Sequence, residues 1–177
     1  GLDNEGHYST ARDIALMSRA LLRYPKITDY TTIWMDTLRN GATSLVNTNR
    51  LVRFYQGATG LKTGTTNGAG CCLSASASRD GLGLIAVVLG AGNSNDRFAA
   101  ARALLDWGYA NLAAVNITPP ELEPLAVTHG TEPLVELTAI PPAGGVVIPK
   151  GQREAMTQTV NLAESLEAPI AAGTEVG

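Results

Sequence analysis

The stretch GLKTGTTNGAGCCLSASA, residues 60–77, decides how the rest of the chain is interpreted. Over residues 71–78, apolar or small residues alternate with serines, as in a β-strand with two different faces. Lys62 stands ahead of this strand between Gly60 and Gly64, and glycine in a strand often marks the close approach of a ligand or of another backbone. A solvated lysine is the competing interpretation. The functional one is that N–H groups, threonine hydroxyls and one ammonium face an anionic or carbonyl-bearing substrate.

The segments that follow predict a hairpin. RDGLG, residues 79–83, has the composition of a turn, and LIAVVLG, residues 84–90, is a continuous apolar run. Such a run is typical of a strand buried on both faces. We therefore expect a strand pair in which the second strand is central.

A helix is expected before the strands, over residues 10–24. Thr10 and Asp13 can form a capping box at its start, and Pro25 stops it. The face expected to be buried carries Ile14, Met17, Leu21 and Tyr24.

A second helix is expected after the strands. It follows GAGNSND, residues 90–96, where Asn93 or Ser94 can cap the N-terminus, and Gly108 is expected at its end. The face expected to be buried carries Phe98, Ala101 and Leu105. The order helix, strands, helix predicts an α+β fold.

The composition changes near residue 110. All nine aromatic residues lie at or before Tyr109, whereas eight of the nine prolines lie from Pro119 onward. The second part consists of short aliphatic runs separated by Pro and Gly, which is typical of a small all-β module. We therefore expect two domains, residues 1–109 and residues 110–177.

Composition and charge exclude several classes of function. The chain has 177 residues, 45% of them hydrophobic, and a net charge of −3 without a run of either sign. A buried core is therefore expected, and a nucleic-acid partner is not. The apolar runs are too short to span a bilayer, and no leader opens the chain, which begins with Gly. The chain is thus interpreted as a mature form, an expressed piece or an excised fragment.

The cysteines and histidines give no sign of a cofactor. Cys71 and Cys72 are adjacent, so they cannot easily reach disulfide geometry, and we expect them to fill space in the strand. Their spacing leaves the redox compartment open. His7 and His129 fall in turn-like sequence and are expected to be solvated. No cluster of metal ligands is recognised, and no cofactor is expected.

Lys62, Thr63 and Gly64 form a K-T-G triplet, one of the motifs of penicillin-binding proteins and class A β-lactamases. The longer stretch from residue 60 to residue 98, preceded by GLDNEGHYSTARDIALMSRALL, closely resembles the serine D-alanyl-D-alanine carboxypeptidases among the low-molecular-mass penicillin-binding proteins. The resemblance implies part of a penicillin-binding, serine β-lactamase-like domain with an antiparallel sheet and flanking helices. It continues into the β module, best in LEAPIAAGTEVG, residues 166–177.

The resemblance implies an acyl-serine mechanism. A serine attacks the peptide carbonyl of D-Ala-D-Ala, the last alanine leaves, and the acyl-enzyme is hydrolysed, with penicillin as a pseudo-substrate. Lys62 would supply positive potential and hold the proton network. Thr63 would bind the terminal carboxylate beside Gly64, and the backbone N–H of Thr65 would be an oxyanion donor.

Arg97 is a partly independent indication. It lies in the first turn of the second helix, where a cation opposes the helix dipole. Asp96 or solvent can compensate for this. Alternatively, the guanidinium and the helix N–H groups together receive a carboxylate. By resemblance, Arg97 matches the arginine that binds the C-terminal carboxylate of the substrate.

The nucleophile is the departure from the family. None of the eight serines has a lysine three positions later or an asparagine two positions later, so neither S-x-x-K nor S-x-N occurs. A serine without an adjacent base does not attack at neutral pH. The chain therefore resembles the C-terminal part of a longer enzyme, and alone it is expected to be inactive.

The resemblance also implies partners and a location. They are a stem peptide of peptidoglycan ending in D-Ala-D-Ala, β-lactams, a missing N-terminal half of the same protein, and the outer face of a bacterial cytoplasmic membrane. A serine β-lactamase-like hydrolase is an alternative, although such enzymes lack the β module. A non-catalytic relative that binds the cell wall is another.

Overall fold

The computed structural model describes residues 2–141 and 145–176. The chain divides into two compact units between Ala113 and Ala114, and each is described by itself. The helices of the first unit are α1 (Ala11–Leu21), α2 (Lys26–Thr31), α3 (Leu51–Phe54) and α4 (Ser94–Asn111). Its strands are β1 (Met35–Leu38), β2 (Thr43–Val46), β3 (Ala58–Thr66), β4 (Gly70–Arg79) and β5 (Leu82–Ala91).

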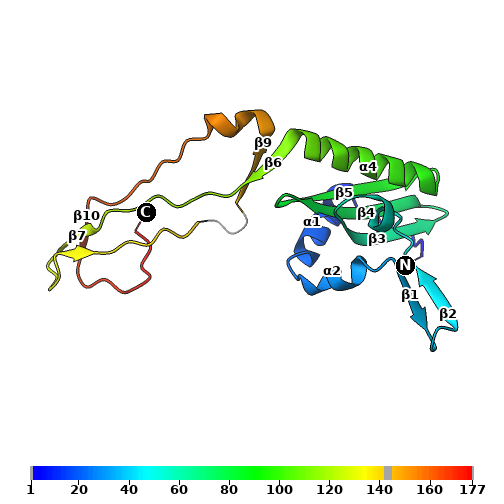
Figure 1. Cartoon of the computed structure of the whole chain (residues 1–177), viewed down its shortest axis with the longest axis horizontal. Helices are drawn as coiled ribbons and strands as arrows, with labels where there is room; N and C mark the ends of the chain where they lie inside the picture. The colour runs from blue at the N-terminus through cyan, green and yellow to red at the C-terminus, as the bar shows by residue number, and fades with distance from the viewer. Residues whose placement is uncertain (1, 142–144, 177) are drawn as a thin grey trace. The chain divides into compact units, whose positions relative to one another are not determined.

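The centre of the first unit is the antiparallel sheet β3-β4-β5 (Figure 1). Asp80 and Gly81 join β4 to β5 with φ of 50° and 79°, the left-handed conformation that a tight hairpin turn requires. The expected hairpin is therefore confirmed. Its second strand is not central, however: β4 has a neighbour on each side, and β5 lies at the edge of the sheet that the structure describes.

Helix α4 covers one face of this sheet (Figure 1). The expected cap is confirmed, since the Asn93 side chain accepts hydrogen bonds from the N–H groups of Asn95 and Asp96. The buried core joins α4 to the odd-numbered residues of β4, and it includes Leu73, Ala75, Ala77, Phe98, Ala101 and Leu105. The predicted buried face of this helix is therefore confirmed.

Gly108 does not end α4, contrary to the sequence-based expectation. The helix continues to Asn111 and Gly108 is buried within it. A Cβ atom at residue 108 would lie 2.6 Å from Leu84 Cδ1 on β5. The absence of a side chain therefore serves close packing of α4 on the sheet.

Helix α1 lies on the other face of the sheet (Figure 1). Its capping box is confirmed: Asp13 N–H donates to Thr10 Oγ1 (3.1 Å), and Thr10 N–H donates to Asp13 Oδ2 (3.1 Å). The predicted buried face is largely wrong. Ser18 is the buried residue, and its hydroxyl lies 2.7 Å from that of Ser74 on β4. A small side chain lets the helix approach the strand there. The exposed residues of the predicted face are Met17, Leu21 and Tyr24.

An aromatic clamp holds the segment that leads into β3. The Arg79 guanidinium lies 4.4 Å from the ring centroids of both Tyr55 and Tyr109, a cation-π arrangement. The Tyr55 hydroxyl donates to Asp106 Oδ1 on α4 (2.7 Å). Burial, followed by this hydrogen bond, raises the pKa of Tyr55 to about 12. The clamp therefore ties the end of α3 to β4 and α4.

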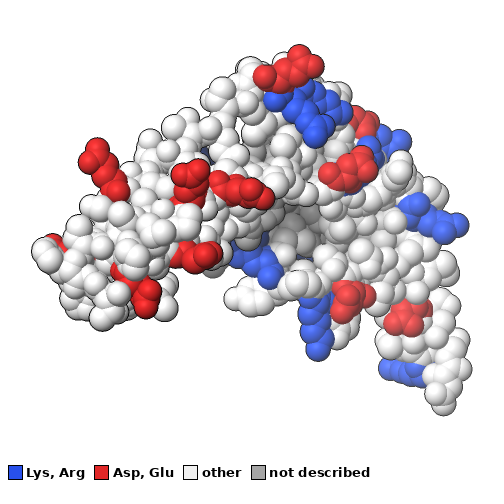
Figure 2. Space-filling model, turned by 60° about the vertical axis from the view of Figure 1, so that its left-hand side comes forward, with Lys and Arg blue, Asp and Glu red and all other residues white. Residues whose placement is uncertain are grey.

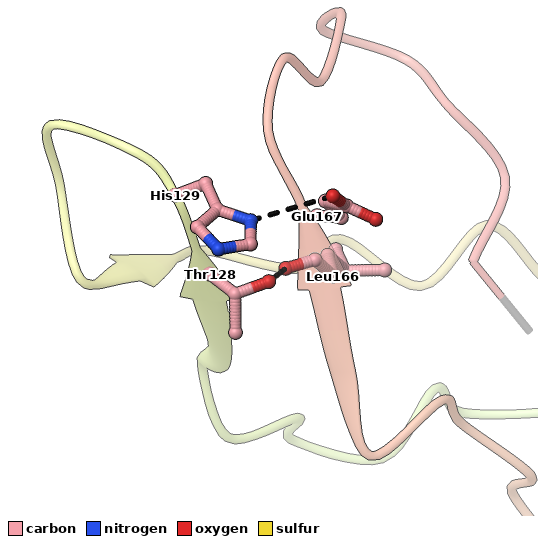
Figure 3. A network of polar contacts seen from close by, with 4 residues as sticks. All are labelled: Thr128, His129, Leu166 and Glu167. Carbon is pink, nitrogen blue, oxygen red and sulfur yellow. Dashed lines mark hydrogen bonds and ion pairs between the residues drawn. The ribbon is translucent and has the colours of Figure 1, made fainter.

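The regular structure of the second unit consists of short strands and one 3-10 helix, joined by longer irregular segments. The strand β6 (Leu112–Val115) spans the division. The other strands are β7 (Leu125–Thr128), β8 (Leu134–Val135), β9 (Val146–Pro149) and β10 (Ser165–Glu167), and the 3-10 helix is η1 (Lys150–Ala155). One sheet has the order β10-β7-β8, and β6 pairs with β9. Where β7 meets β10, His129 Nδ1 lies 3.3 Å from Glu167 Oε1, and Thr128 Oγ1 donates to Leu166 O (Figure 3).

Acidic and basic side chains are scattered over the face shown in Figure 2. Among the described residues, no helix is long and apolar enough to cross a membrane. In the same part of the chain, no group of three or more His, Cys, Asp or Glu side chains is placed to hold a metal ion.

Candidate functional site

The K-T-G triplet lies in the second half of β3, at an edge of the sheet. β4 pairs with one side of β3, and no strand of the described chain pairs with the other. Alternate backbone N–H and C=O groups of an edge strand point away from the sheet. β3 therefore has free hydrogen-bonding groups for a partner that lies alongside it.

The register of β3 on β4 separates the predicted site residues by face. Thr63 pairs with Leu73, and Thr65 pairs with Cys71. Cross-strand partners project to the same face, so both threonines lie on the side of the α4 core. Lys62 belongs to the opposite face because successive side chains alternate.

Arg97 joins α4 to the end of β3. Its Nη1 donates to Gly64 O (3.1 Å), Thr65 Oγ1 (3.1 Å) and Cys72 O (3.3 Å), and its Nη2 donates to Ser94 Oγ (3.2 Å). Arg97 is only 7% exposed, and its Nε has no hydrogen-bond partner among the described residues. We name Arg97, Gly64, Thr65 and Cys72 the Arg97 cluster. The Arg97 guanidinium therefore holds β3 in position.

Thr63 is buried next to this cluster, with 8% of its surface exposed. Its hydroxyl lies 2.7 Å from the hydroxyl of Thr48. Thr48 stands in a turn braced by its neighbours, where Asn47 Oδ1 accepts from Asn49 N–H (2.9 Å) and Asn47 Nδ2 donates to Ile33 O (2.9 Å). This turn was not predicted from the sequence. The signal was the N-T-N triplet, since asparagine side chains commonly hydrogen-bond to the backbone two residues on.

Lys62 does not converge on the Arg97 cluster. Its side chain is exposed, and its ammonium donates a hydrogen bond to Thr63 O. Two pockets among the described residues, with volumes of about 620 and 550 Å³, lie elsewhere in the chain. Neither is lined by Lys62 or Arg97. The structure therefore brings Thr63, Gly64, Thr65 and Arg97 together as one wall, which we call the β3 wall. It leaves Lys62 at the strand edge.

The two cysteines are free thiols on opposite faces of β4. The Thr65 hydroxyl lies 3.6 Å from Cys71 Sγ, and Cys72 Sγ lies 3.4 Å from Ala69 O. Neither thiol is fully buried. His7 and His129 are both exposed, as expected from the sequence.

The glycines beside Lys62 have different roles. A Cβ atom on Gly60 would lie 2.6 Å from Thr31 Cβ, and Gly60 has φ of 132°. Its close approach is therefore to α2 and not to a ligand. Gly64 has no heavy atom within 4 Å of the position of a Cβ atom, so this part of β3 is open.

We expect Gly60→Ala to lower the free energy of unfolding by about 1–3 kcal/mol from backbone strain at this φ, and by more because the added methyl group collides with Thr31. Gly64→Ala is the matched control on the same strand. It should change the free energy of unfolding by less than about 0.5 kcal/mol. Denaturant unfolding of the two variants measures both. Equal losses would contradict this account of Gly60.

Comparison with known proteins agrees with this architecture. The family model described as D-alanyl-D-alanine carboxypeptidase matches residues 1–93, about half of the chain. The D-alanyl-D-alanine carboxypeptidase DacF of Bacillus subtilis is 37% identical over 186 residues, which cover 100% of this chain and 47% of that protein. The chain belongs to the D-alanyl-D-alanine carboxypeptidase family. It spans about half the length of the curated relatives that it matches.

Solved structures support the same assignment. Penicillin binding protein 5 of Haemophilus influenzae superposes with a TM-score of 0.77 at 29% identity, covering 98% of this chain and 52% of that one. Penicillin-binding protein D2 of Listeria monocytogenes, in its cefotaxime-bound form, gives a TM-score of 0.56 at 36% identity, covering 62% of this chain and 45% of that one. The expected α+β fold of this class is therefore confirmed.

Proposed function

We propose that the chain supplies the carboxylate-binding wall of a penicillin-sensitive D-Ala-D-Ala carboxypeptidase. The observation that carries the proposal is the β3 wall: the Arg97 guanidinium is bonded to Gly64 and Thr65, next to the hydroxyl of Thr63. The hydroxyls of Thr63 and Thr65 lie about 7 Å apart on one face of the strand, and the Arg97 guanidinium adds a positive charge there. This arrangement suits the terminal carboxylate of a peptide.

Each residue of the wall has a proposed role. Thr63 donates its hydroxyl proton to the carboxylate. Arg97 adds positive potential and orients Thr65, whose backbone N–H is an oxyanion donor at the open edge of β3. Lys62 adds a second positive charge at that edge and takes part in proton transfer to or from the nucleophile.

The nucleophile must come from another segment, because no serine of this chain has the S-x-x-K or S-x-N context. We infer that a segment corresponding to the other half of the relatives supplies it, as part of the same protein. The peptidoglycan stem peptide ending in D-Ala-D-Ala is the proposed substrate. β-Lactams are the proposed inhibitors, in line with the cefotaxime-bound Listeria relative. The outer face of a bacterial cytoplasmic membrane is the proposed location.

A labelled penicillin tests the proposal. The chain alone is expected to take up no label covalently. A chimera is then made in which this chain replaces the segment of Bacillus subtilis DacF that aligns with it. That chimera is expected to form an adduct, detected by intact mass, and peptide mapping should locate it on a serine outside this chain.

Two results would count against the proposal. The first is an acylated serine in the isolated chain, which would show that a nucleophile is present. The second is a chimera that unfolds cooperatively, so that its fold is intact, yet takes up no label. That result would favour a non-catalytic relative that binds the cell wall.

A further inference from the structure

The N-terminal segment holds the turn between β3 and β4 through one carboxylate. Thr66 Oγ1 donates to Asp3 Oδ1 (2.5 Å), and Gly68 N–H donates to Asp3 Oδ2 (3.0 Å). Ala69 N–H in turn donates to Thr66 Oγ1 (3.0 Å). One side chain from the start of the chain thus makes direct contacts with two of these turn residues and, through Thr66, holds a third.

The carboxylate of Asp3 occupies the space that a side chain at residue 68 would need. A Cβ atom on Gly68 would lie 3.1 Å from both Asp3 Cγ and Asp3 Oδ2. A side chain at residue 68 would therefore press on the carboxylate and lengthen its hydrogen bond to the amide. The glycine at this position permits the contact with Asp3.

We call the Asp3 carboxylate and its two partners, Thr66 and Gly68, the Asp3 clamp. It begins one residue after the β3 wall. Thr66 follows Thr65 directly and pairs with Gly70, the rung next to the Thr65–Cys71 pair. Displacing Thr66 would move the peptide plane between Thr65 and Thr66. The Thr65 hydroxyl, to which Arg97 donates a hydrogen bond, would move with it. We propose that Asp3 is a positioning residue for the β3 wall, acting through Thr66 and Gly68. This inference rests on the proposed function of the wall.

The charge of Asp3 strengthens both contacts. The hydrogen bond from Thr66, and next that from Gly68, lowers the pKa of Asp3 from its ordinary 3.8. Desolvation opposes these two effects by raising the pKa of Asp3, and His7 on the same segment lowers it slightly. Residues 66–70 carry no charge. The contribution of Asp3 to folding is therefore present above pH 3.8 and is lost as the pH falls through its lower folded pKa.

The clamp is tested first by NMR on the chain itself. The Gly68 amide proton should titrate with a midpoint below pH 3.8, and this titration should vanish in Asp3→Asn. In Asp3→Ala, hydrogen exchange of the Gly68 and Ala69 amides, which donate to Asp3 and to Thr66, should accelerate about 2- to 12-fold, as expected for the loss of one hydrogen bond each. Glu5→Ala is the matched control, an exposed carboxylate two residues away that should change neither.

Positioning is tested in the chimera with DacF. Asp3→Ala should slow penicillin acylation about 2- to 12-fold. Asp3→Asn should restore the rate at neutral pH, because its carbonyl can accept from Gly68 and its amide can donate to Thr66. Below pH 3.8 the ratio of the Asp3→Asn rate to the unsubstituted rate should rise because, of these two side chains, only Asp3 loses its charge there.

The outcomes separate the two hypotheses. If the unsubstituted chimera folds but is not acylated, the proposed function fails, and the amide measurements still decide the clamp. An Asp3→Ala chain whose Gly68 and Ala69 amides exchange at the original rate overturns the clamp. An active chimera whose acylation is unaffected by Asp3→Ala overturns the positioning role.

Discussion

Replacing Thr63 with valine is expected to reduce kcat/KM of the DacF chimera for a D-Ala-D-Ala peptide about 10- to 160-fold. Valine is close to threonine in shape, so the loss reports one hydrogen bond to a charged group, which contributes about 1.5–3 kcal/mol. In the proposed geometry the Thr63 hydroxyl donates to the substrate carboxylate, and the Thr48 hydroxyl, 2.7 Å away, donates to Thr63. Steady-state hydrolysis kinetics measure the effect.

Two controls separate this role from a structural one. Thr63→Ser keeps the hydroxyl and should retain most of the activity. A D-Ala-D-Ala peptide whose C-terminus is amidated lacks the carboxylate, so Thr63→Val should change its kcat/KM much less than it changes that of the free acid. An equal loss on both peptides would show that Thr63 does not recognise the carboxylate.

Replacing Leu105 with alanine is expected to destabilise the chain by about 2–5 kcal/mol. Leu105 is 1% exposed, on the face of α4 that packs against the sheet with Phe98 and Ala101. The substitution removes buried methyl groups and leaves a cavity between α4 and β4, which cannot close without moving the helix. Because Arg97 is on the same helix, the contacts of Arg97 with Gly64 and Thr65 should weaken as well.

Leu104→Ala is the matched control, since Leu104 is 51% exposed on the same helix. It should change the free energy of unfolding by less than about 0.5 kcal/mol. Denaturant unfolding, followed by far-ultraviolet circular dichroism, measures both variants. Similar losses for the two leucines would mean that α4 does not pack as described.

Local patterns predicted the elements well. The capping box of α1, the Asn93 cap of α4 and the alternation of β4 each depend on residues a few positions apart. Interactions at that range depend on the spacing of residues along a regular helix or strand, so they can be predicted from the sequence alone. The same holds for the Asp80–Gly81 turn, where a positive φ is needed within a short loop.

Long-range packing was predicted less well. Met17 and Leu21 have the spacing of a buried face, but α1 instead packs through Ser18, whose small size allows its hydroxyl to reach Ser74. Glycine is common at the end of a helix, but Gly108 lies inside α4, where its lack of a side chain leaves room for Leu84 on β5. Periodicity shows that a helix has an apolar face without showing which neighbour will cover it.

The sequence by itself determined the class of the protein, since the K-T-G stretch and the elements around it are contiguous and specific. It also determined what this chain lacks, because the absence of S-x-x-K can be read without coordinates. Only the tertiary structure decided which residues meet. Arg97 reaches Gly64 from 33 positions away, and Thr66 reaches Asp3 from 63 positions away. The physical reason is that such contacts depend on how helices and loops dock on the sheet, which is a property of the whole packed core and of no single segment.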